Sequence, residues 1–168
     1  MKPQILGLFA HTLSEAEKLV ADVPDERFAE LPYTNAKHPA WVLTHLSVGA
    51  GMMIGCIKGD PNDLGGVPAS WPELCPAGGA VSGDRAQFPS KDELLTALRM
   101  THEKLAGMVE AMTEQQLAQE FVVPEWREFF PTNAVATAYM LAHHEGYHLG
   151  QLSQWRMAAG FGPPEGAF

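Results

Sequence analysis

The sequence predicts an all-α fold in which four main helices close a bundle. Four segments repeat apolar residues at the three-and-four spacing of an amphipathic helix, and none shows the period of two that is typical of a half-buried strand. Glycine- and proline-rich stretches separate these segments and limit their lengths. Because each helix has one apolar face to bury, a bundle is the expected arrangement.

Length and composition predict a single domain that spans residues 1–168. Hydrophobic residues make up 46% of the chain and charged residues 18%, the balance of a globular protein. A domain of this size buries roughly 70% of the surface that its unfolded chain exposes, so it needs neither disulfides nor a metal ion to fold. Any metal ion that it binds is therefore expected to serve function.

Charge and cysteine content exclude several classes of partner. Twenty acidic and eleven basic residues give a net charge of -9, which disfavours binding to nucleic acid and to anionic lipids. His11 and Glu15 interrupt the short apolar run near the N-terminus, and no segment reaches the ~18 uninterrupted apolar residues of a membrane span. Cys56 and Cys75 are too few for a disulfide framework. We expect a cytoplasmic protein with no nucleic-acid or membrane partner.

The first helix is expected from Pro3 to about Asp22. Its apolar residues recur every three or four positions, at Ile5, Leu8, Phe9, Leu13, Ala16, Leu19 and Val20. Pro3 suits a first helical turn, where the backbone N–H would have no helical partner. A short turn over residues 24–28 is expected to follow, before Pro32 breaks the pattern.

The second helix is expected from Pro39 to about Lys58, because a Gly-Asp-Pro sequence at 59–61 stops it. Its apolar stripe contains Trp41, Val42, His45, Val48 and Met52, with Ile54 and Ile57 further on. A histidine, His45, therefore lies on a face that should be buried. Residues 59–89 are rich in glycine and proline, so they form a long crossover loop that permits a non-sequential order of helices.

Two capping boxes predict the starts of the next two helices. Ser90 and Glu93 have the S-x-x-E form in which both side chains satisfy free amide groups, so a third helix begins there and continues to about residue 112. Its apolar residues are Leu94, Leu98, Leu105, Met108, Val109 and Met112. Thr113 and Gln116 repeat the pattern and predict a short helix.

An aromatic connector, residues 121–130, leads to the last helix. It contains Phe121, Trp126, Phe129 and Phe130. Prolines at 124 and 131 make this segment irregular, and we expect it to roof a pocket. The fourth helix is expected from about Asn133 to Ala159, with Gly160 as its C-terminal stop.

The fourth helix carries two histidines on its apolar stripe. The stripe reads Leu141, His144, His148, Leu152 and Trp155. Side chains four apart on a helix have Cβ atoms ~5–6 Å apart, from which the imidazoles of His144 and His148 can converge on one ion. Buried imidazoles without partners cost ~1–3 kcal/mol each, and a shared metal ion removes much of that cost. Together with His45, these residues predict a three-histidine metal site.

The donor set limits the choice of metal ion. Three histidines without a cysteine favour a divalent ion such as zinc, nickel, iron or manganese. Three protein ligands leave a coordination position for water or substrate, as in a catalytic site. The alternative interpretation is that these are core histidines whose nitrogens are satisfied by backbone carbonyls, tyrosine or water.

Residues 144–148 also match H-E-x-x-H, in which the glutamate activates water in zinc proteases. Such a protease needs strands that bind the peptide, and none is predicted. Glu165 is the one carboxylate after His148, and it lies beyond Gly160 with no helix to present it. A zinc hydrolase is therefore a remote alternative. Glu145 lies ~100° around the helix from His144, so we expect it to face solvent.

Catalytic residues are not identified by any pattern, and Glu145 and His102 are weak candidates. His102 lies near the stripe of the third helix, where a fourth ligand or a proton carrier is conceivable and a structural role is favoured. We interpret His11, His38 and His143 as structural or exposed residues.

Two neighbours of His148 are expected to orient it. Tyr147 and Gln151 lie within reach of its ring by helical spacing. Cys56 is interpreted as a small buried residue, because no cation lies near it in sequence to stabilise a thiolate.

These motifs give the chain a resemblance to a known family. Residues 41–46 have the W-x-x-x-H-L pattern, and residues 144–151 the H-x-x-x-H-x-G-Q pattern, of the DinB/YfiT-like proteins. The order and separation of the three histidines and the four-helix outline extend the resemblance over nearly the whole chain. It implies a four-helix bundle of up-down-down-up topology in which His45, His144 and His148 hold a metal ion. It also implies a homodimer.

The resemblance further implies a class of reaction. Characterised members to which this chain is similar include thiol-dependent S-transferases and a mycothiol-dependent isomerase, in which the metal activates a low-molecular-weight thiol. The leading hypothesis is a divalent-metal-dependent enzyme of this kind that acts on a small-molecule electrophile. A non-catalytic metal- or ligand-binding stress-response protein is the alternative, and a metal-free helical interaction module is a third. The segments 59–89 and 121–130 depart from the best-studied relatives, and we expect both to shape the pocket.

Overall fold

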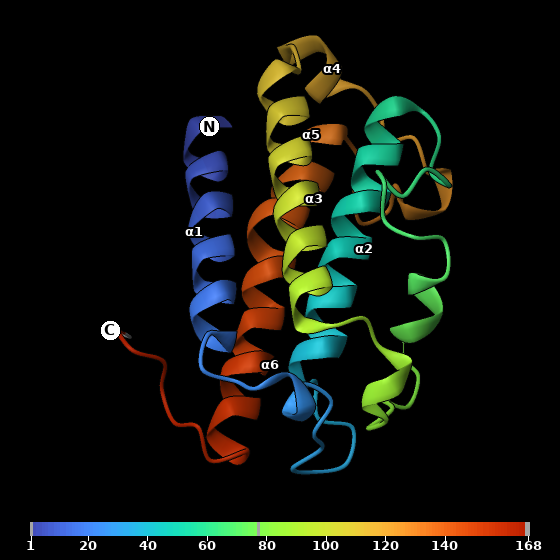
Figure 1. The fold of residues 1–168 in the computed structure, drawn as a ribbon. Helices are drawn as coiled ribbons and strands as arrows, with labels where there is room; N and C mark the ends of the chain where they lie inside the picture. Colours follow the sequence, from blue (N-terminus) through green and yellow to red (C-terminus); the bar gives the residue numbers. More distant parts are fainter. Residues whose placement is uncertain (1, 77, 167–168) are drawn as a thin grey trace.

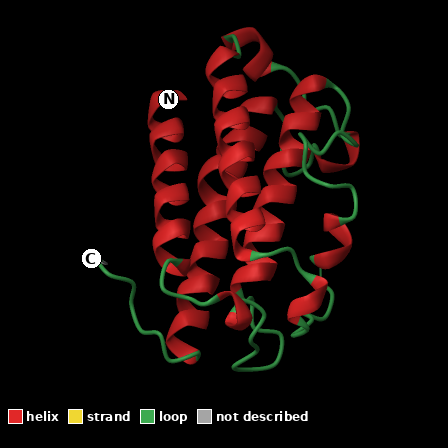
Figure 2. Cartoon of the chain, viewed as in Figure 1, coloured by secondary structure: helices red, strands yellow, loops and turns green. Residues whose placement is uncertain are grey.

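The computed structural model describes residues 2–76 and 78–166, and these residues form helices and loops without a strand (Figures 1 and 2). The long helical segments are α1 (Lys2–Val20), α2 (Pro39–Lys58), α3 (Lys91–Ala111) and a last segment made of α5 (Asn133–Ala138), η5 (Tyr139–His144) and α6 (Glu145–Ala158). The short elements are η1 (Asp25–Arg27), η2 (Trp71–Leu74), η3 (Arg85–Gln87), α4 (Glu114–Ala118) and η4 (Pro124–Trp126). The predicted all-α class is confirmed.

The long segments lie side by side (Figure 1). Helix α3 packs against both α1 and α2, and α6 also packs against α1 and α2. In Figure 1, α1 and the last segment run in one direction, and α2 and α3 run in the other. Because α2 and α3 follow one another in the chain and are parallel, their connection must return along the length of α2, which explains its length.

The helix ends are determined by local chemistry, and the predicted bounds are confirmed to within two residues. The Ser90–Glu93 and Thr113–Gln116 capping boxes both form, with each side chain bonded to the other residue's backbone N–H. Helix α2 ends at Gly59, whose φ of 85° lies in the left-handed region that favours glycine.

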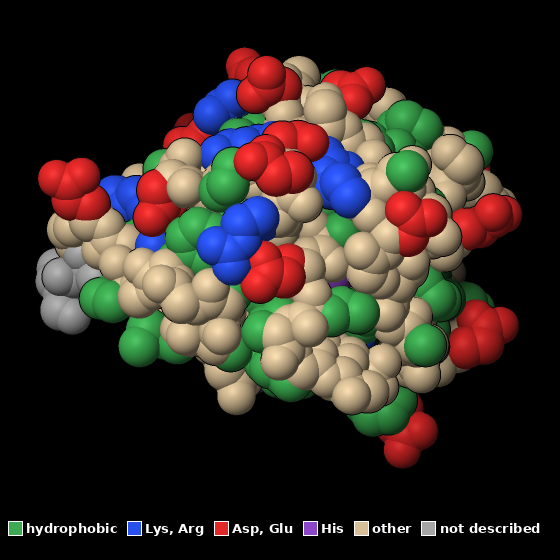
Figure 3. All heavy atoms as spheres, turned by 60° about the horizontal axis from the view of Figure 1, so that its bottom comes forward, with side chains coloured by type: hydrophobic (Ala, Val, Ile, Leu, Met, Phe, Trp, Pro, Cys, Tyr) green, Lys and Arg blue, Asp and Glu red, His purple; other side chains and the backbone are tan. Residues whose placement is uncertain are grey.

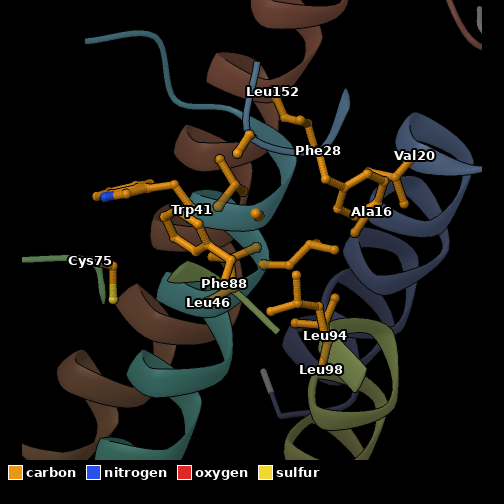
Figure 4. Packing of buried hydrophobic residues seen from close by; sticks show 14 of the residues in the cluster. Ala16, Val20, Phe28, Trp41, Leu46, Cys75, Phe88, Leu94, Leu98 and Leu152 are labelled. Atoms are coloured by element: carbon orange, nitrogen blue, oxygen red, sulfur yellow. The ribbon is translucent and has the colours of Figure 1, made fainter. Parts of the chain in front are cut away.

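The crossover loop packs closely against α2. Trp71, Val81 and Phe88 join the same apolar cluster as Trp41. Figure 4 shows Phe88 and Cys75 of the loop in this cluster near Trp41. A Cβ atom at Gly55 would collide with a backbone carbonyl oxygen of the loop, so a residue without a side chain is needed at this contact. The loop therefore covers one side of α2 and is a fixed part of the core.

Helix α2 is the one helix within residues 2–76 and 78–166 that is long and apolar enough to cross a membrane. In the structure, 78% of its most apolar window is buried against other elements. The core helix of a soluble protein passes the same test of length and composition, so this feature is weak evidence for a membrane span.

His38 is the N-cap of α2, so the structural role predicted for it is confirmed. Its side chain is fully buried. The backbone N–H of Trp41 donates to His38 Nδ1 at 3.1 Å, and His38 Nε2 donates to the Ser82 carbonyl oxygen at 2.8 Å. Burial lowers the pKa of His38 from 6.5 to about 4. The neutral ring therefore joins the start of α2 to the crossover loop.

This arrangement predicts a loss of stability in acid. The unfolded chain protonates His38 below about pH 6.5, and the folded chain resists protonation until about pH 4, so the free energy of unfolding falls as the pH drops between these values. At roughly 1.4 kcal/mol per pKa unit, the titration of His38 lowers the free energy of unfolding at pH 5 by about 2 kcal/mol.

The measurement is urea denaturation of the chelator-treated protein at pH 7 and pH 5. His38→Asn is the comparison, because asparagine keeps an N-cap acceptor but does not titrate. The unfolding free energy of the native protein should fall by about 2 kcal/mol more than that of the variant. Parallel losses in the two proteins would show that His38 does not resist protonation.

Candidate metal centre

The structure brings His45, His144 and His148 together. His45 lies on α2, His144 is the last residue of η5, and His148 is one turn further along in α6. One nitrogen of each ring lies within 4.8 Å of those of the other two, and this is the one such group of three or more ligand side chains in the described parts of the chain. His148 is buried, and the other two histidines are half-buried.

The distances fit a shared ion. His45 Nε2 lies 3.0 Å from His144 Nε2. Two nitrogens that each bind one ion at ~2.0–2.1 Å in tetrahedral geometry are about 3.3 Å apart, so a small displacement of either ring would accommodate the ion. The cluster includes no carboxylate or thiolate, so the donors are imidazoles alone. Such a set suits zinc, nickel, iron or manganese.

The protonation state of the three rings also fits. Burial lowers the pKa of His45 to about 3 and that of His144 to about 4, and it lowers the pKa of His148 as well. All three imidazoles are therefore neutral at pH 7. Neutral imidazole is the form that binds a metal ion, so protons compete little for these nitrogens.

Neighbouring side chains hold two of the rings in place. His148 Nδ1 donates to Gln151 Oε1 at 2.8 Å, which leaves His148 Nε2 free as a ligand atom. This hydrogen bond supports the orienting role predicted for Gln151. Trp41 stacks on His45, with ring centroids 4.7 Å apart and an angle of 12° between the planes. Tyr147 only contacts His148 edge-on, and its side chain is largely exposed.

Glu145 does not face solvent, so that expectation was wrong. It is 2% exposed and lies in the core between α1 and α3. His102 Nε2 donates to Glu145 Oε1 at 2.9 Å, and Thr12 Oγ1 donates to Glu145 Oε2 at 2.7 Å. Neither Glu145 nor His102 belongs to the histidine cluster.

Glu145 is buried because α6 buries a wide arc of its surface. This helix packs against α1 on one side and α2 on the other, so more than one stripe is buried. Glu145, Leu149, Leu152 and Arg156 are spaced by three or four and are all buried. Leu149 and Leu152 mark this second stripe in the sequence, but its other two members are charged, so only the packing shows that Glu145 lies near the centre of the buried arc. His144 lies at its edge, toward α2.

A π-helical turn aligns the two halves of the last segment. Over η5 the backbone bonds from i to i+5, which inserts one residue and rotates the following residues by ~100° relative to a regular helix. On an uninterrupted helix Ala136 and Leu152 would lie about 160° apart, but both are buried. The turn therefore lets α5 and α6 bury their apolar sides together, with His144 at the junction.

The remaining histidines and cysteine behave as predicted. His102 is 3% exposed and stacks on Phe9, with ring centroids 3.8 Å apart. His11 and His143 are exposed. Cys56 is buried, and burial raises the pKa of its thiol. None of these side chains is a further ligand in the histidine cluster.

A cavity of about 620 Å³ adjoins the cluster. Its wall is formed by His45, Gly49, Met52, Met53, Cys56, Phe121, Trp126, Phe129, Phe130, Ala136, Tyr139, Met140 and His144. The prediction that the aromatic connector roofs a pocket is confirmed. The prediction that residues 59–89 also shape it was wrong for this cavity, because they contribute none of its lining and pack along α2 instead.

Several lining residues share a helical spacing with the predicted metal ligands, which is a signal in the sequence for the cavity wall. His45, Gly49, Met52 and Cys56 are spaced by three or four, so they form one stripe of α2 that continues from the histidine. The matching stripe of the last segment includes Met140, which lies four residues before His144. The alignment of His144 with Ala136 depends on the π-helical turn.

Fold and site together define a helical protein with a three-histidine cluster beside an apolar cavity. Residues 8–152 match the model of the DinB superfamily, and this range includes all three histidines. The chain therefore belongs to the DinB superfamily, as the motifs predicted. No curated protein and no solved structure matches it.

Proposed function

We propose that this protein is a divalent-metal-dependent enzyme that joins a low-molecular-weight thiol to a small electrophile, or isomerises the electrophile with that thiol. His45, His144 and His148 would hold the metal ion. The observation that carries the proposal is that three neutral imidazoles converge beside a cavity large enough for a small molecule. Membership of the DinB superfamily supports the metal site.

The arrangement of the chain supports a more specific description of the fold. We propose a four-helix bundle of up-down-down-up topology, because the directions of the long segments in Figure 1 and the contacts of α3 and α6 agree with it.

The homodimer and the cytoplasmic location are further proposals. The two cysteines are unpaired and buried, which suits a reducing compartment. Basic side chains are interspersed with acidic ones on the face in Figure 3, which gives no support to a nucleic-acid partner.

Each part of the site has a separate task in this proposal. A divalent ion bound by the three histidines would act as a Lewis acid that lowers the pKa of a coordinated thiol. Gln151 holds the proton of His148 on Nδ1 and so keeps the other ring nitrogen available. The apolar wall of the cavity would hold the body of the electrophile beside the metal ion.

The hydrolase alternative loses its catalytic base. In H-E-x-x-H enzymes the glutamate must reach the metal-bound water. Here both oxygens of Glu145 are engaged by Thr12 and His102, and Glu145 is not among the residues that line the cavity. The water-activating role therefore has no support in the geometry.

A non-catalytic ligand-binding protein is the second candidate. It is favoured by the scarcity of groups in the cavity wall that could transfer a proton. Apart from the two histidines of the cluster, the titratable lining residues are Tyr139 and Cys56. Such a protein would capture a metal ion or a small molecule tightly without turnover.

The two candidates are separated by an assay of 1-chloro-2,4-dinitrobenzene with glutathione, cysteine, coenzyme A, mycothiol and bacillithiol. In the reaction, a C–S bond replaces the C–Cl bond, chloride leaves with the bonding electrons, and the thiol proton passes to solvent. We expect the metal-loaded protein to consume the electrophile with at least one of these thiols, and the chelator-treated protein to show only the uncatalysed rate. Metal-loaded protein that is inactive with all five thiols would favour the ligand-binding candidate.

A further inference from the structure

We propose that the cavity beside the histidine cluster selects electrophiles with a neutral aromatic or bulky aliphatic body, and that its side chains disfavour a body that carries a carboxylate. The inference names the substrate class of the site described above and so rests on the proposed function. It depends on three features of the cavity, namely the chemistry of its wall, the flexibility of its wall and the exposure of its rim.

The wall offers no charged partner to an anion. No Lys, Arg, Asp or Glu is among its lining residues. Away from the two histidines, a carboxylate that enters such a space loses its water and gains no compensating charge from the side chains, which is strongly unfavourable. Lys37 is the cation beside the cluster, but its Nζ lies 3.9 Å from the centre of the Trp41 ring, and Lys37 does not line the cavity. The side chains of the wall therefore favour an uncharged ligand over a charged one.

The wall suits an apolar body of variable shape. The volume of about 620 Å³ lies within the roughly 300–1,000 Å³ of small-molecule sites. Methionines 52, 53 and 140 bring flexible thioethers that adapt to different outlines. Phe121 and Phe130 of the aromatic connector line the same cavity, pack edge to face, and offer ring edges and faces to a planar ligand.

The rim of the cavity provides a driving force for binding. Phe129 is 73% exposed and Trp126 is 41% exposed, although both line the cavity. A bound apolar molecule would cover this aromatic surface and remove it from water, which is favourable. His45 and His144 form the polar part of the wall, so the bound molecule would place its one polar group toward the cluster and its apolar body among the rings.

The test compares 2-acetylnaphthalene with 2-naphthoate, which have similar size and differ in charge. Binding is measured by isothermal titration calorimetry on the protein as purified and after removal of metal by a chelator. We expect the ketone to bind at least ten times more tightly than the carboxylate in the chelator-treated protein, where no bound ion can coordinate the carboxylate. Equal or tighter binding of the carboxylate in that preparation would overturn the proposal.

The chelator-treated arm separates this proposal from the proposed function. If the purified protein contains no metal ion, the proposed function fails, and the preference for the ketone can still be measured. If metal is present and the preference is absent, only the substrate class is wrong.

Variants locate the binding site. Met52→Lys places a cation in the half-buried part of the wall, so it should weaken ketone binding at least fivefold and strengthen naphthoate binding. Met157→Lys makes the same change at a methionine that is 60% exposed and lies outside the cavity, and it should alter neither. Phe129→Ala should weaken ketone binding without a loss of folding, because its side chain is mostly exposed. Unchanged ketone binding in both Met52→Lys and Phe129→Ala would place the ligand elsewhere and refute the proposal.

Discussion

Replacing His148 with alanine is expected to reduce bound metal from about one equivalent per chain to near zero. Removing a group that hydrogen-bonds to a metal-binding side chain commonly lowers metal affinity ~10–100-fold. Removing the metal-binding side chain itself should therefore lower the affinity more than about 100-fold. His45→Ala should have the same effect, because both ring nitrogens belong to one cluster. Elemental analysis of protein purified without a chelator or a histidine tag measures the outcome, and circular dichroism should show unchanged helicity.

The chain contains its own control for this experiment. His143 precedes His144 on the same helical segment but is exposed and outside the cluster, so His143→Ala should retain the metal ion. Gln151→Ala should give an intermediate loss of roughly 10–100-fold in affinity, because His148 keeps its ligand atom but loses its hydrogen bond. Full metal content in both His45→Ala and His148→Ala would refute the site. It would leave the three residues as core histidines.

Replacing Glu145 with alanine is expected to lower the free energy of unfolding by about 2–6 kcal/mol, because it removes the partner of two buried polar groups at ~1–3 kcal/mol each. The change leaves the Nε2 of His102 and the hydroxyl of Thr12 without their Glu145 partner in the core. His102 is 3% exposed, and its Nδ1 has no partner among the residues that the structure describes, so the bond to Glu145 is the hydrogen bond that orients the ring. Urea denaturation at pH 7 measures the loss.

Two further variants identify its cause. Glu17→Ala removes a partly exposed carboxylate on α1 that pairs with the exposed Arg99, and it should cost only about 0–1 kcal/mol. The double variant Glu145→Leu with His102→Leu replaces both polar partners with apolar groups and should recover part of the lost stability. If Glu145→Ala were no more destabilising than Glu17→Ala, the buried cluster would have no structural role. Metal binding should persist in Glu145→Gln, since Glu145 is not a ligand.

The sequence by itself determined the helices and the histidine cluster. Amphipathic spacing and capping residues are local properties, and they predicted the long helices to within two residues. The same spacing placed His144 and His148 on an inward-facing side of one helix, and His45 on that of another. Buried imidazoles need partners, so these two placements predicted the three-histidine cluster that the structure shows.

Only the tertiary structure decided where Glu145 points and which segments form the cavity. The direction of Glu145 depends on how many neighbours enclose α6, and the packing of α1 and α2 on both of its sides buries a wider arc than one stripe predicts. The alignment of Ala136 with His144 depends on the π-helical turn of η5, which no residue in that segment signals. The crossover loop packs along α2 while the aromatic connector roofs the cavity. These outcomes depend on contacts between distant segments, and local sequence patterns do not encode them.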